Sequence, residues 1–98
     1  MVASIGHYVA NKPVAGKSGR SGEITNPATG EVTAKVAFAS VEEVDAAVQV
    51  AKMAQLAWAA TPPLRRQRIM FNLKGLIEKR TDDLARHLSL EHGKTFDD

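Results

Sequence analysis

The sequence predicts an α+β fold in which two short N-terminal β-hairpins are followed by three α-helices. Two patterns support this fold class. Before residue 40, short runs of alternating apolar and polar side chains are separated by turns that contain proline or glycine. After it, apolar side chains recur at the 3.6-residue period of a helix that buries one face. We therefore expect hairpins over 1–39 and helices over 40–98, within the one domain that 98 residues allow.

The first predicted hairpin starts with a strand at Ile5–Val9, where apolar side chains alternate with small or polar ones. A turn is expected at Asn11-Lys12-Pro13, because asparagine and proline are typical turn residues. Val14 then begins a return strand. The glycine-containing stretch 16–22 is predicted to be a loop.

The second predicted hairpin pairs a strand at Glu23–Thr25 with a strand at Glu31–Val36. Asn26–Gly30 forms the turn between them, since proline presets the backbone and Gly30 supplies the positive φ that such turns often need. Hairpins this short are marginally stable alone, so we expect other elements to cover them.

The first predicted helix starts at a capping box. Ser40 accepts a hydrogen bond from the third helical N–H, and Glu43 reaches back toward the N–H of Ser40. Alanine-rich faces bury little area, so this helix should pack closely but be weakly stabilised. Its predicted buried stripe is Val44, Ala47, Val48, Ala51, Ala54 and Trp58.

Two further helices are predicted. Thr61 is expected to cap the second helix, with a proline at its first position. Thr81-Asp82-Asp83 is expected to cap the third, and Gly93 to end it in the left-handed conformation. Their predicted apolar faces are Leu64, Ile69, Leu73, Leu76 and Ile77 in the second helix and Leu84 and Leu88 in the third.

Composition narrows the class of protein. The absence of cysteine excludes disulfides, thiolate metal ligands and a thiol nucleophile from these residues. The first residues lack the basic run and apolar core of a signal peptide, and no apolar stretch reaches the roughly 18–20 residues that cross a membrane. We therefore expect a cytoplasmic protein without a membrane partner.

Gly16-Lys17-Ser18 resembles the end of a phosphate-binding loop. That motif needs another glycine where this sequence has Asn11, and it must open a helix, whereas Gly19 and Gly22 follow here. A hairpin loop is therefore favoured over a phosphate site.

The three histidines do not form a recognisable metal motif. His87 and His92 are five residues apart rather than the four that place two ligands on one helix face, and His7 is remote from both in sequence. We expect structural or solvated histidines and no metal-binding residue.

Arg65, Arg66 and Arg68 make the start of the second helix basic. Such a cluster can hold an anion, and a basic middle helix of three can suggest DNA binding. Pro62-Pro63 at the helix start, a net charge of only +2 and five aromatic residues favour a solvated or ion-paired face instead. We expect no nucleic-acid partner.

Carboxylates such as Asp82 and Asp83 stand at helix starts, where the helix dipole favours them, and have no partner suited to acid–base catalysis. No nucleophile stands with a base. From the residues alone, we therefore expect no catalytic and no cofactor-binding residue in this chain.

Several stretches, in order, resemble the N-terminal part of the aldehyde dehydrogenase superfamily. They are Asn26–Val32, Ser40–Val48 with Ala57-Trp58, Arg66 with Arg68–Met70, and Leu88–Thr95. The resemblance covers nearly the whole chain. It implies that residues 1–98 are the N-terminal portion of a cofactor-binding domain within a larger α/β fold.

Within the superfamily, Ile5–Tyr8, Val14–Arg20 and Glu91–Thr95 look most like the methylmalonate-semialdehyde dehydrogenase branch, although Phe38 and Leu90 depart from the expected pattern. The resemblance implies an enzyme that oxidises a semialdehyde with NAD and transfers the acyl group to coenzyme A. The implied chemistry is cysteine attack, hydride transfer and thioester exchange. A homo-oligomeric parent enzyme is also implied.

The resemblance also implies that the catalytic cysteine, the general base and the nucleotide-contacting loops lie beyond residue 98. We therefore expect an N-terminal fragment that is inactive and binds no cofactor on its own, and whose partners are the rest of the enzyme or other copies of it. The alternative is a non-catalytic interaction module that packs its alanine-rich helices on a partner chain.

Overall fold

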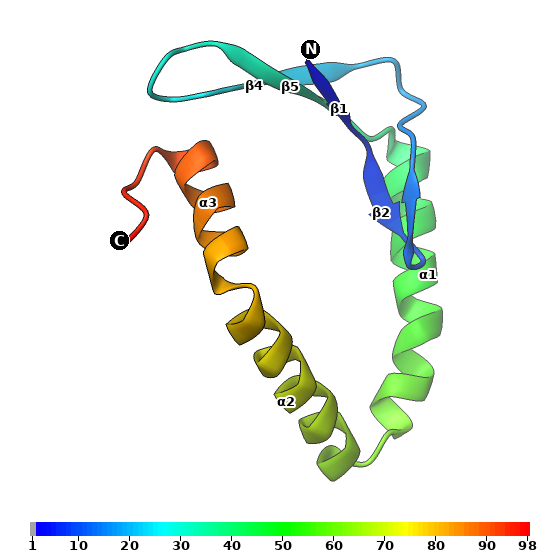
Figure 1. Ribbon diagram of the computed structural model, residues 1–98. Coiled ribbons are helices and arrows are strands. Elements are labelled where there is room, and N and C mark those ends of the chain that lie inside the picture. Colours follow the sequence, from blue (N-terminus) through cyan, green and yellow to red (C-terminus); the bar gives the residue numbers. More distant parts are fainter. Residues whose placement is uncertain (1) are drawn as a thin grey trace.

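The computed structural model describes residues 2–98 and shows a small β region followed by three helices that form two arms of a V (Figure 1). The predicted fold class, hairpins followed by helices, is confirmed. The strands are β1 (Ala3–Ile5), β2 (His7–Val9), β3 (Lys12–Val14), β4 (Ser21–Thr25) and β5 (Val32–Ala37). The helices are α1 (Val41–Ala60), α2 (Pro63–Lys79) and α3 (Thr81–His92).

The strands form two sheets. Both predicted hairpins are present: β2 pairs with β3 in antiparallel fashion, and β4 pairs with β5. The sequence did not predict the third pairing, in which β1 lies parallel to β5 with Ala3 opposite Ala34. The larger sheet therefore has the order β1-β5-β4, and β2-β3 is a separate ribbon.

Gly6 divides what the sequence predicted as one strand. A Cβ atom on Gly6 would lie 2.5 Å from the backbone oxygen of Val14, closer than any side chain tolerates. The chain passes close to β3 here and leaves the larger sheet, so β1 and β2 are separate strands in different sheets. The prediction of a single strand over Ile5–Val9 is wrong for this reason.

The two hairpin turns have different backbones. Ala10 and Asn11 both have positive φ, 53° and 63°, as in the tight turns whose twist matches two paired strands. The turn therefore lies one residue before the predicted one, and Lys12 already belongs to β3. In the second turn Gly30 has a φ of 75°, as predicted, and its N–H donates to Asn26 O at 2.7 Å.

The capping box of α1 is confirmed. Ser40 Oγ accepts from Glu43 N at 3.1 Å, and Glu43 Oε1 lies 3.5 Å from Ser40 N. Gly93 ends α3 with a φ of 83°, also as predicted.

The predicted threonine caps of α2 and α3 are wrong. Thr61 Oγ1 donates back to Ala57 O at 2.8 Å and so completes the end of α1, while Pro62 holds the cap position of α2 without a side-chain bond. Thr81 Oγ1 likewise donates to Ile77 O at 3.0 Å. A threonine hydroxyl bonds equally well to a carbonyl one turn back, which sequence spacing does not reveal.

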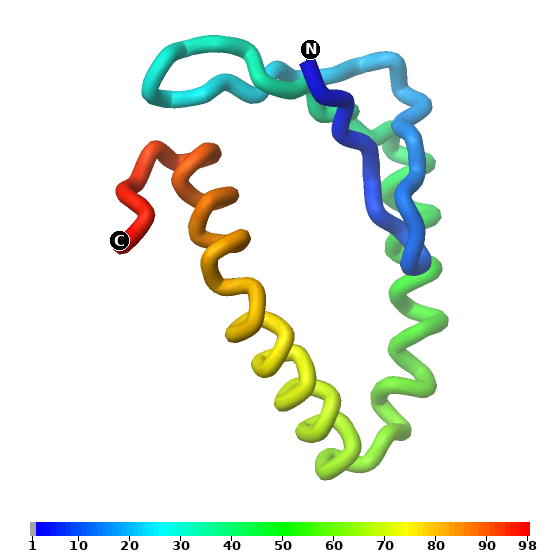
Figure 2. Tube along the Cα trace, in the orientation of Figure 1, coloured from blue at the N-terminus to red at the C-terminus, as the bar shows by residue number. Residues whose placement is uncertain are grey.

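Almost no other part of the chain packs on the apolar faces of the helices. Among the described residues only Ala34, in the centre of the larger sheet, is a buried apolar residue. The predicted buried faces stay open: Val48 is 50% exposed, Leu73 46% and Leu88 61%. The tube in Figure 2 follows α1 along one arm of the V and α2 and α3 along the other. No helix of residues 2–98 is long and apolar enough to cross a membrane.

Candidate functional site

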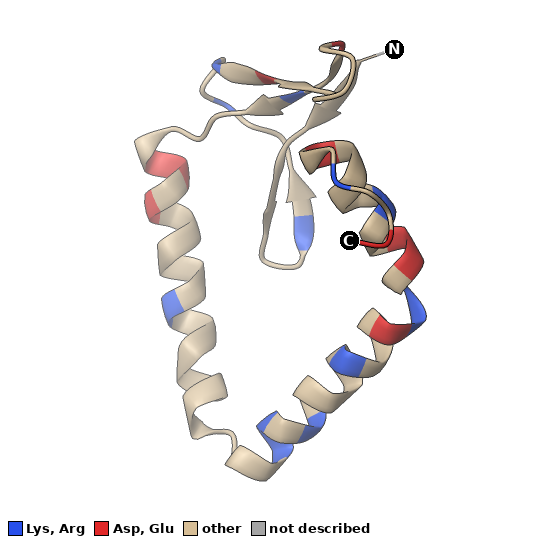
Figure 3. Cartoon of the chain, turned by 90° about the vertical axis from the view of Figure 1, so that its left-hand side faces the viewer, with Lys and Arg blue, Asp and Glu red and all other residues tan. Residues whose placement is uncertain are grey.

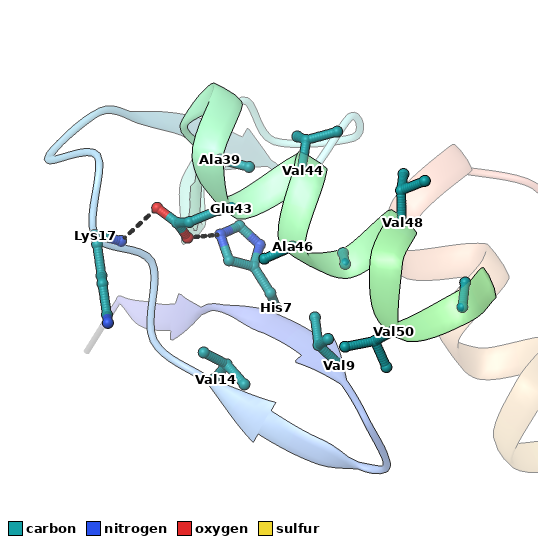
Figure 4. A pocket seen from close by; sticks show the side chains of 12 residues that line it. His7, Val9, Val14, Lys17, Ala39, Glu43, Val44, Ala46, Val48 and Val50 are labelled. Atoms are coloured by element: carbon teal, nitrogen blue, oxygen red, sulfur yellow. Dashed lines mark hydrogen bonds and ion pairs between the residues drawn. The ribbon is translucent and has the colours of Figure 1, made fainter. Parts of the chain in front are cut away.

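A hollow lies between the β2–β3 hairpin and the first turns of α1. We call it the hairpin–helix cavity. Its volume is about 560 Å³, and one side is open. Valine and alanine make up most of its wall, and three ionisable side chains stand at one end (Figure 4). The lining residues are His7, Val9, Val14, Lys17, Ala39, Glu43, Val44, Ala46, Ala47, Val48, Val50 and Ala51.

The Glu43 carboxylate organises the polar end of the cavity. Its Oε1 accepts from the backbone N–H of Lys17 at 3.0 Å and lies 3.5 Å from Ser40 N. Its Oε2 lies 3.2 Å from His7 Nε2. One side chain of α1 thus meets the loop after β3, its own helix cap and strand β2.

These contacts favour the charged form of Glu43. The hydrogen bond from Lys17 N lowers the pKa of this carboxyl most, and the bonds from Ser40 and the nearby imidazole of His7 lower it further, while partial burial acts in the opposite direction. The result is a pKa below the ordinary glutamate value, so the group is a carboxylate at neutral pH.

His7 is held in a narrow space. Its ring is mostly covered, and a Cβ atom on Gly16 would lie 3.2 Å from Nε2. The distance to Glu43 suits an ion pair, but the two atoms are not aligned for a hydrogen bond, so Nε2 has no hydrogen-bond partner among the described residues. The attraction between the two groups is therefore largely a matter of charge and depends on the protonation of the imidazole.

The stretch that resembled a phosphate loop is a loop between β3 and β4, as predicted, and it straps the start of α1. Ser18 Oγ donates to Phe38 O, and Arg20 donates from its guanidinium to Ala39 O at 3.0 Å. The Lys17 side chain points away from Glu43, while its backbone N–H faces the carboxylate (Figure 4).

The start of α1 and the loop after β3 do not fit the phosphates of a dinucleotide. A dinucleotide phosphate would need free N–H groups at a helix start after a strand, and α1 is the helix that follows β5. There the Ser40 capping box already occupies N–H groups, and Glu42 and Glu43 place negative charge in the first turn. The N–H of Lys17 is likewise committed to Glu43.

The basic cluster lies at the start of α2. Figure 3 shows Lys and Arg residues gathered there, and acidic residues at the starts of α1 and α3. Arg66 Nε is buried without a hydrogen-bond partner within residues 2–98. Among residues 2–98, the ion pair within this helix lies elsewhere, between Lys74 and Glu78.

The histidines are far from equivalent. His7 is at the cavity, whereas His87 and His92 are on α3. In the part of the chain that the structure describes, no group of three or more His, Cys, Asp or Glu side chains could hold a metal ion.

The polar contacts at this site hold segments of the chain together. Glu43 accepts hydrogen bonds that hold backbone segments, and the side chain of Lys17, the amine that lines the cavity, points away from it (Figure 4). That the chain carries no catalytic, cofactor-binding or metal-binding residue stays a prediction. Sequence reasoning saw Glu43 as a helix cap but missed its contacts with His7 and Lys17.

Comparison with known proteins places this fold. The model of the "Aldehyde dehydrogenase family" matches residues 14–98. The chain belongs to the aldehyde dehydrogenase family. A chain from Sinorhizobium meliloti, described as a methylmalonate-semialdehyde dehydrogenase complexed with NAD, is 49% identical with a TM-score of 0.95 over 99% of this chain. The methylmalonate-semialdehyde dehydrogenase of Oceanimonas doudoroffii is 38% identical with a TM-score of 0.92 over 98% of this chain.

Curated relatives agree with the solved structures. "Malonate-semialdehyde dehydrogenase 3" of Geobacillus kaustophilus is 45% identical over 94% of this chain. The chain spans about a fifth of each of these aldehyde dehydrogenases: 19% of the Geobacillus protein and 20% of the Sinorhizobium chain. In those solved enzymes the elements described above therefore form part of a much larger aldehyde dehydrogenase fold, as the sequence predicted.

Proposed function

We propose that this chain is the N-terminal part of an NAD-dependent, CoA-acylating semialdehyde dehydrogenase that acts on methylmalonate semialdehyde or a similar semialdehyde. The observation that carries the proposal is the likeness to the Sinorhizobium chain, 49% identical over 99% of this chain. A Caenorhabditis elegans relative, 47% identical over 78% of this chain and 14% of its own length, bears the word "acylating" in its name.

The exposed helices support the proposal physically. Apolar side chains on α1, α2 and α3 stay half exposed, and monomeric soluble proteins rarely leave so much contiguous apolar surface open. In the proposed enzyme, the remaining four-fifths of the polypeptide supplies the cover, the nucleophile and the sites for NAD and coenzyme A. Residues 1–98 then belong to its cofactor-binding domain as a supporting layer.

The same open faces also fit the alternative of a non-catalytic interaction module. The likeness to dehydrogenases over nearly the whole chain favours the enzyme, because a module with another partner would need no such match. A reducing, cytoplasmic setting, which suits a chain without cysteine, and a homo-oligomeric parent enzyme belong to the proposal.

The test is a chimera in which this chain replaces the matching segment of the Sinorhizobium protein. We expect the chimera to form NADH and acyl-CoA from methylmalonate semialdehyde when both NAD and coenzyme A are present, at a rate within about tenfold of the unmodified protein. Omitting coenzyme A should suppress acyl-CoA and slow turnover. The 98-residue chain alone should form no NADH.

Two results would contradict the proposal. One is a chimera that is folded and of the same oligomeric mass as the unmodified protein but inactive. The other is NADH formation by the 98-residue chain alone. Light scattering of the chimera gives the mass, and circular dichroism shows whether it is folded.

A further inference from the structure

The turn between β4 and β5 lies against the end of α3 at the open end of the V (Figure 1). Pro27 is part of this turn, and Gly93 is the residue that ends the helix. A Cβ atom on Gly93 would lie 3.2 Å from Cγ and 3.7 Å from Cβ of Pro27. The proline ring therefore already occupies part of the space that a side chain at position 93 would need.

The turn is held in one shape by its own hydrogen bonds. Asn26 N donates to Glu31 O at 2.9 Å, and Gly30 N donates to Asn26 O at 2.7 Å. The side chain of Asn26 accepts from Ala28 N at 2.9 Å. Because Pro27 also has a fixed φ, it is presented to α3 by a stiff segment.

The end of α3 is equally well defined. Gly93 N donates to Ser89 O at 2.9 Å and so closes the last turn of the helix. The residues that follow fold back along α3, where the ring of Phe96 lies 5.9 Å from the Arg86 guanidinium. Two stiff parts of the chain thus meet at Pro27 and Gly93.

The place of this contact gives it leverage over the V. The two arms join at a short corner, since α1 ends at Ala60 and α2 begins at Pro63. With 17 residues in α2 and 12 in α3, the second arm is about 40 Å long at about 1.5 Å per residue. A rotation of about 5° at the corner would move the far end of such an arm by about 3–4 Å. A contact at Gly93 therefore constrains the angle between the arms more than an equal contact near the corner.

The polar contacts of the β region do not perform this task. The hydrogen bonds of Ser18, Arg20 and Glu43 hold the β region to the start of α1. Within residues 2–98, no hydrogen bond or ion pair joins the β region to α2 or α3. Across the open end of the V, the two regions meet by packing.

We propose that Pro27 and Gly93 form a clasp that closes the open end of the V and sets the angle between its two arms. Glycine suits position 93 for two reasons, because its φ is positive and because a Cβ there would press on the proline ring. The clasp holds the open apolar faces of α1 and α2 in a fixed relation before another surface covers them. This inference concerns the chain itself and does not depend on the proposed enzymatic activity.

Two spin labels, one on each arm, measure the angle. The chain has no cysteine, so Gln49→Cys in α1 and His87→Cys in α3 direct the labels to two exposed positions. We expect double electron–electron resonance on the labelled 98-residue chain to give one narrow distance distribution. In the unlabelled chain, a nuclear Overhauser effect should connect protons of Pro27 and Gly93.

Gly93→Asn places a wedge in the clasp, and asparagine is chosen because it tolerates positive φ. The mean distance between the labels should shift by about 1 Å or more, since carbon atoms pack at about 3.5–4.0 Å and the added Cβ alone would lie at 3.2 Å. Gly30→Asn is the matched control. Gly30 also has positive φ, 75°, but a Cβ there meets no atom within 4 Å, so the distance should not change. Adding Pro27→Ala to Gly93→Asn removes the nearest carbon and should reverse part of the shift.

Four results would each overturn the clasp. Two concern the wild-type contact: a broad distance distribution, or no Overhauser effect between Pro27 and Gly93. The third is the same label distance in Gly93→Asn as in Gly30→Asn. The fourth is a shift in Gly93→Asn that Pro27→Ala leaves unchanged, because the added side chain would then act on some other part of the chain.

Discussion

The β region and the helical region differ in what surrounds their apolar side chains. In the larger sheet Ala34 is 6% exposed, and Ile24 on β4 and Val32 and Val36 on β5 are half-buried. In α1, α2 and α3 no residue is buried, although all three helices are regular and continuous. The sheet therefore has the beginning of its own core, whereas the helices satisfy their backbone bonds and leave their apolar faces for another surface.

This difference shows which interactions are local. A helix closes its hydrogen bonds within itself, so it can be well formed before anything packs on it, but most of its stability in a protein comes from tertiary packing. The strands of the larger sheet pair residues that lie 7 to 31 positions apart in the sequence, and this pairing brings some side chains together. The three helices in this chain should thus depend on the rest of the enzyme more than the sheet does.

The largest expected effect is on α2 inside a complete enzyme. In the chimera, Leu73→Ala should lower the free energy of unfolding by about 2–5 kcal/mol, because a covered leucine leaves a cavity when it is truncated. In the 98-residue chain, where Leu73 is 46% exposed, the loss should stay under about 1 kcal/mol. Urea denaturation of both proteins measures the two values, and equal small losses would show that this face of α2 is not covered.

Substituting alanine for one glycine in the β region and for one in α2 should change stability in opposite directions. Gly6→Ala places a Cβ 2.5 Å from a backbone oxygen of Val14 and should destabilise the β region by about 1–3 kcal/mol. Gly75→Ala, in α2, meets no atom within 4 Å and should stabilise the chain by about 1 kcal/mol. Thermal unfolding of the chimera should move in opposite directions, and a shared direction would contradict the close approach at Gly6.

The helix caps allow a smaller test. Ser40→Ala removes a hydroxyl that accepts from Glu43 N and should lower stability by about 0.5–2 kcal/mol. Thr61→Ala removes only a bond back to Ala57 O and should cost less than about 0.5 kcal/mol. Denaturation midpoints of the two variants separate the cases. If Thr61→Ala lost as much stability as Ser40→Ala, the result would support the helix cap that the sequence predicted at Thr61.

The smallest effect concerns an exposed ion pair on α2. Lys74 and Glu78 form an i, i+4 pair with both side chains more than 60% exposed. Lys74→Ala should change the free energy of unfolding by less than about 0.5 kcal/mol, and raising the salt concentration should remove even that difference. A salt-resistant loss above 1 kcal/mol would mean that the pair is covered in the complete enzyme.

The features that the sequence predicted well are set by neighbours in the chain. The capping box needs only Ser40 and Glu43, and the left-handed stops at Gly30 and Gly93 need only a residue without a Cβ. The same local reasoning failed at Thr61, because its hydroxyl can either accept from an N–H at the start of the next helix or donate to a carbonyl one turn back, and here it donates to Ala57 O.

The features that could not be predicted from the sequence join segments that are distant along the chain. The pairing of β1 with β5 brings Ala3 to Ala34, and the start of α1 brings Glu43 to His7 of β2; neither pattern is periodic. The family was nevertheless recognisable, since the resemblance rested on short motifs in order along the chain. The candidate site was not, because a glutamate that also caps its helix gives no sequence signal of its other partners.

Hydrogen exchange of the helices, compared between the 98-residue chain and the chimera, tests the central claim most directly. We expect amides in α1, α2 and α3 to become at least about tenfold better protected in the chimera, equivalent to about 1.4 kcal/mol, while amides shared by β4 and β5 gain less. Equal helix protection in the two proteins would mean that the helices need no cover from the rest of a dehydrogenase, and would contradict the account.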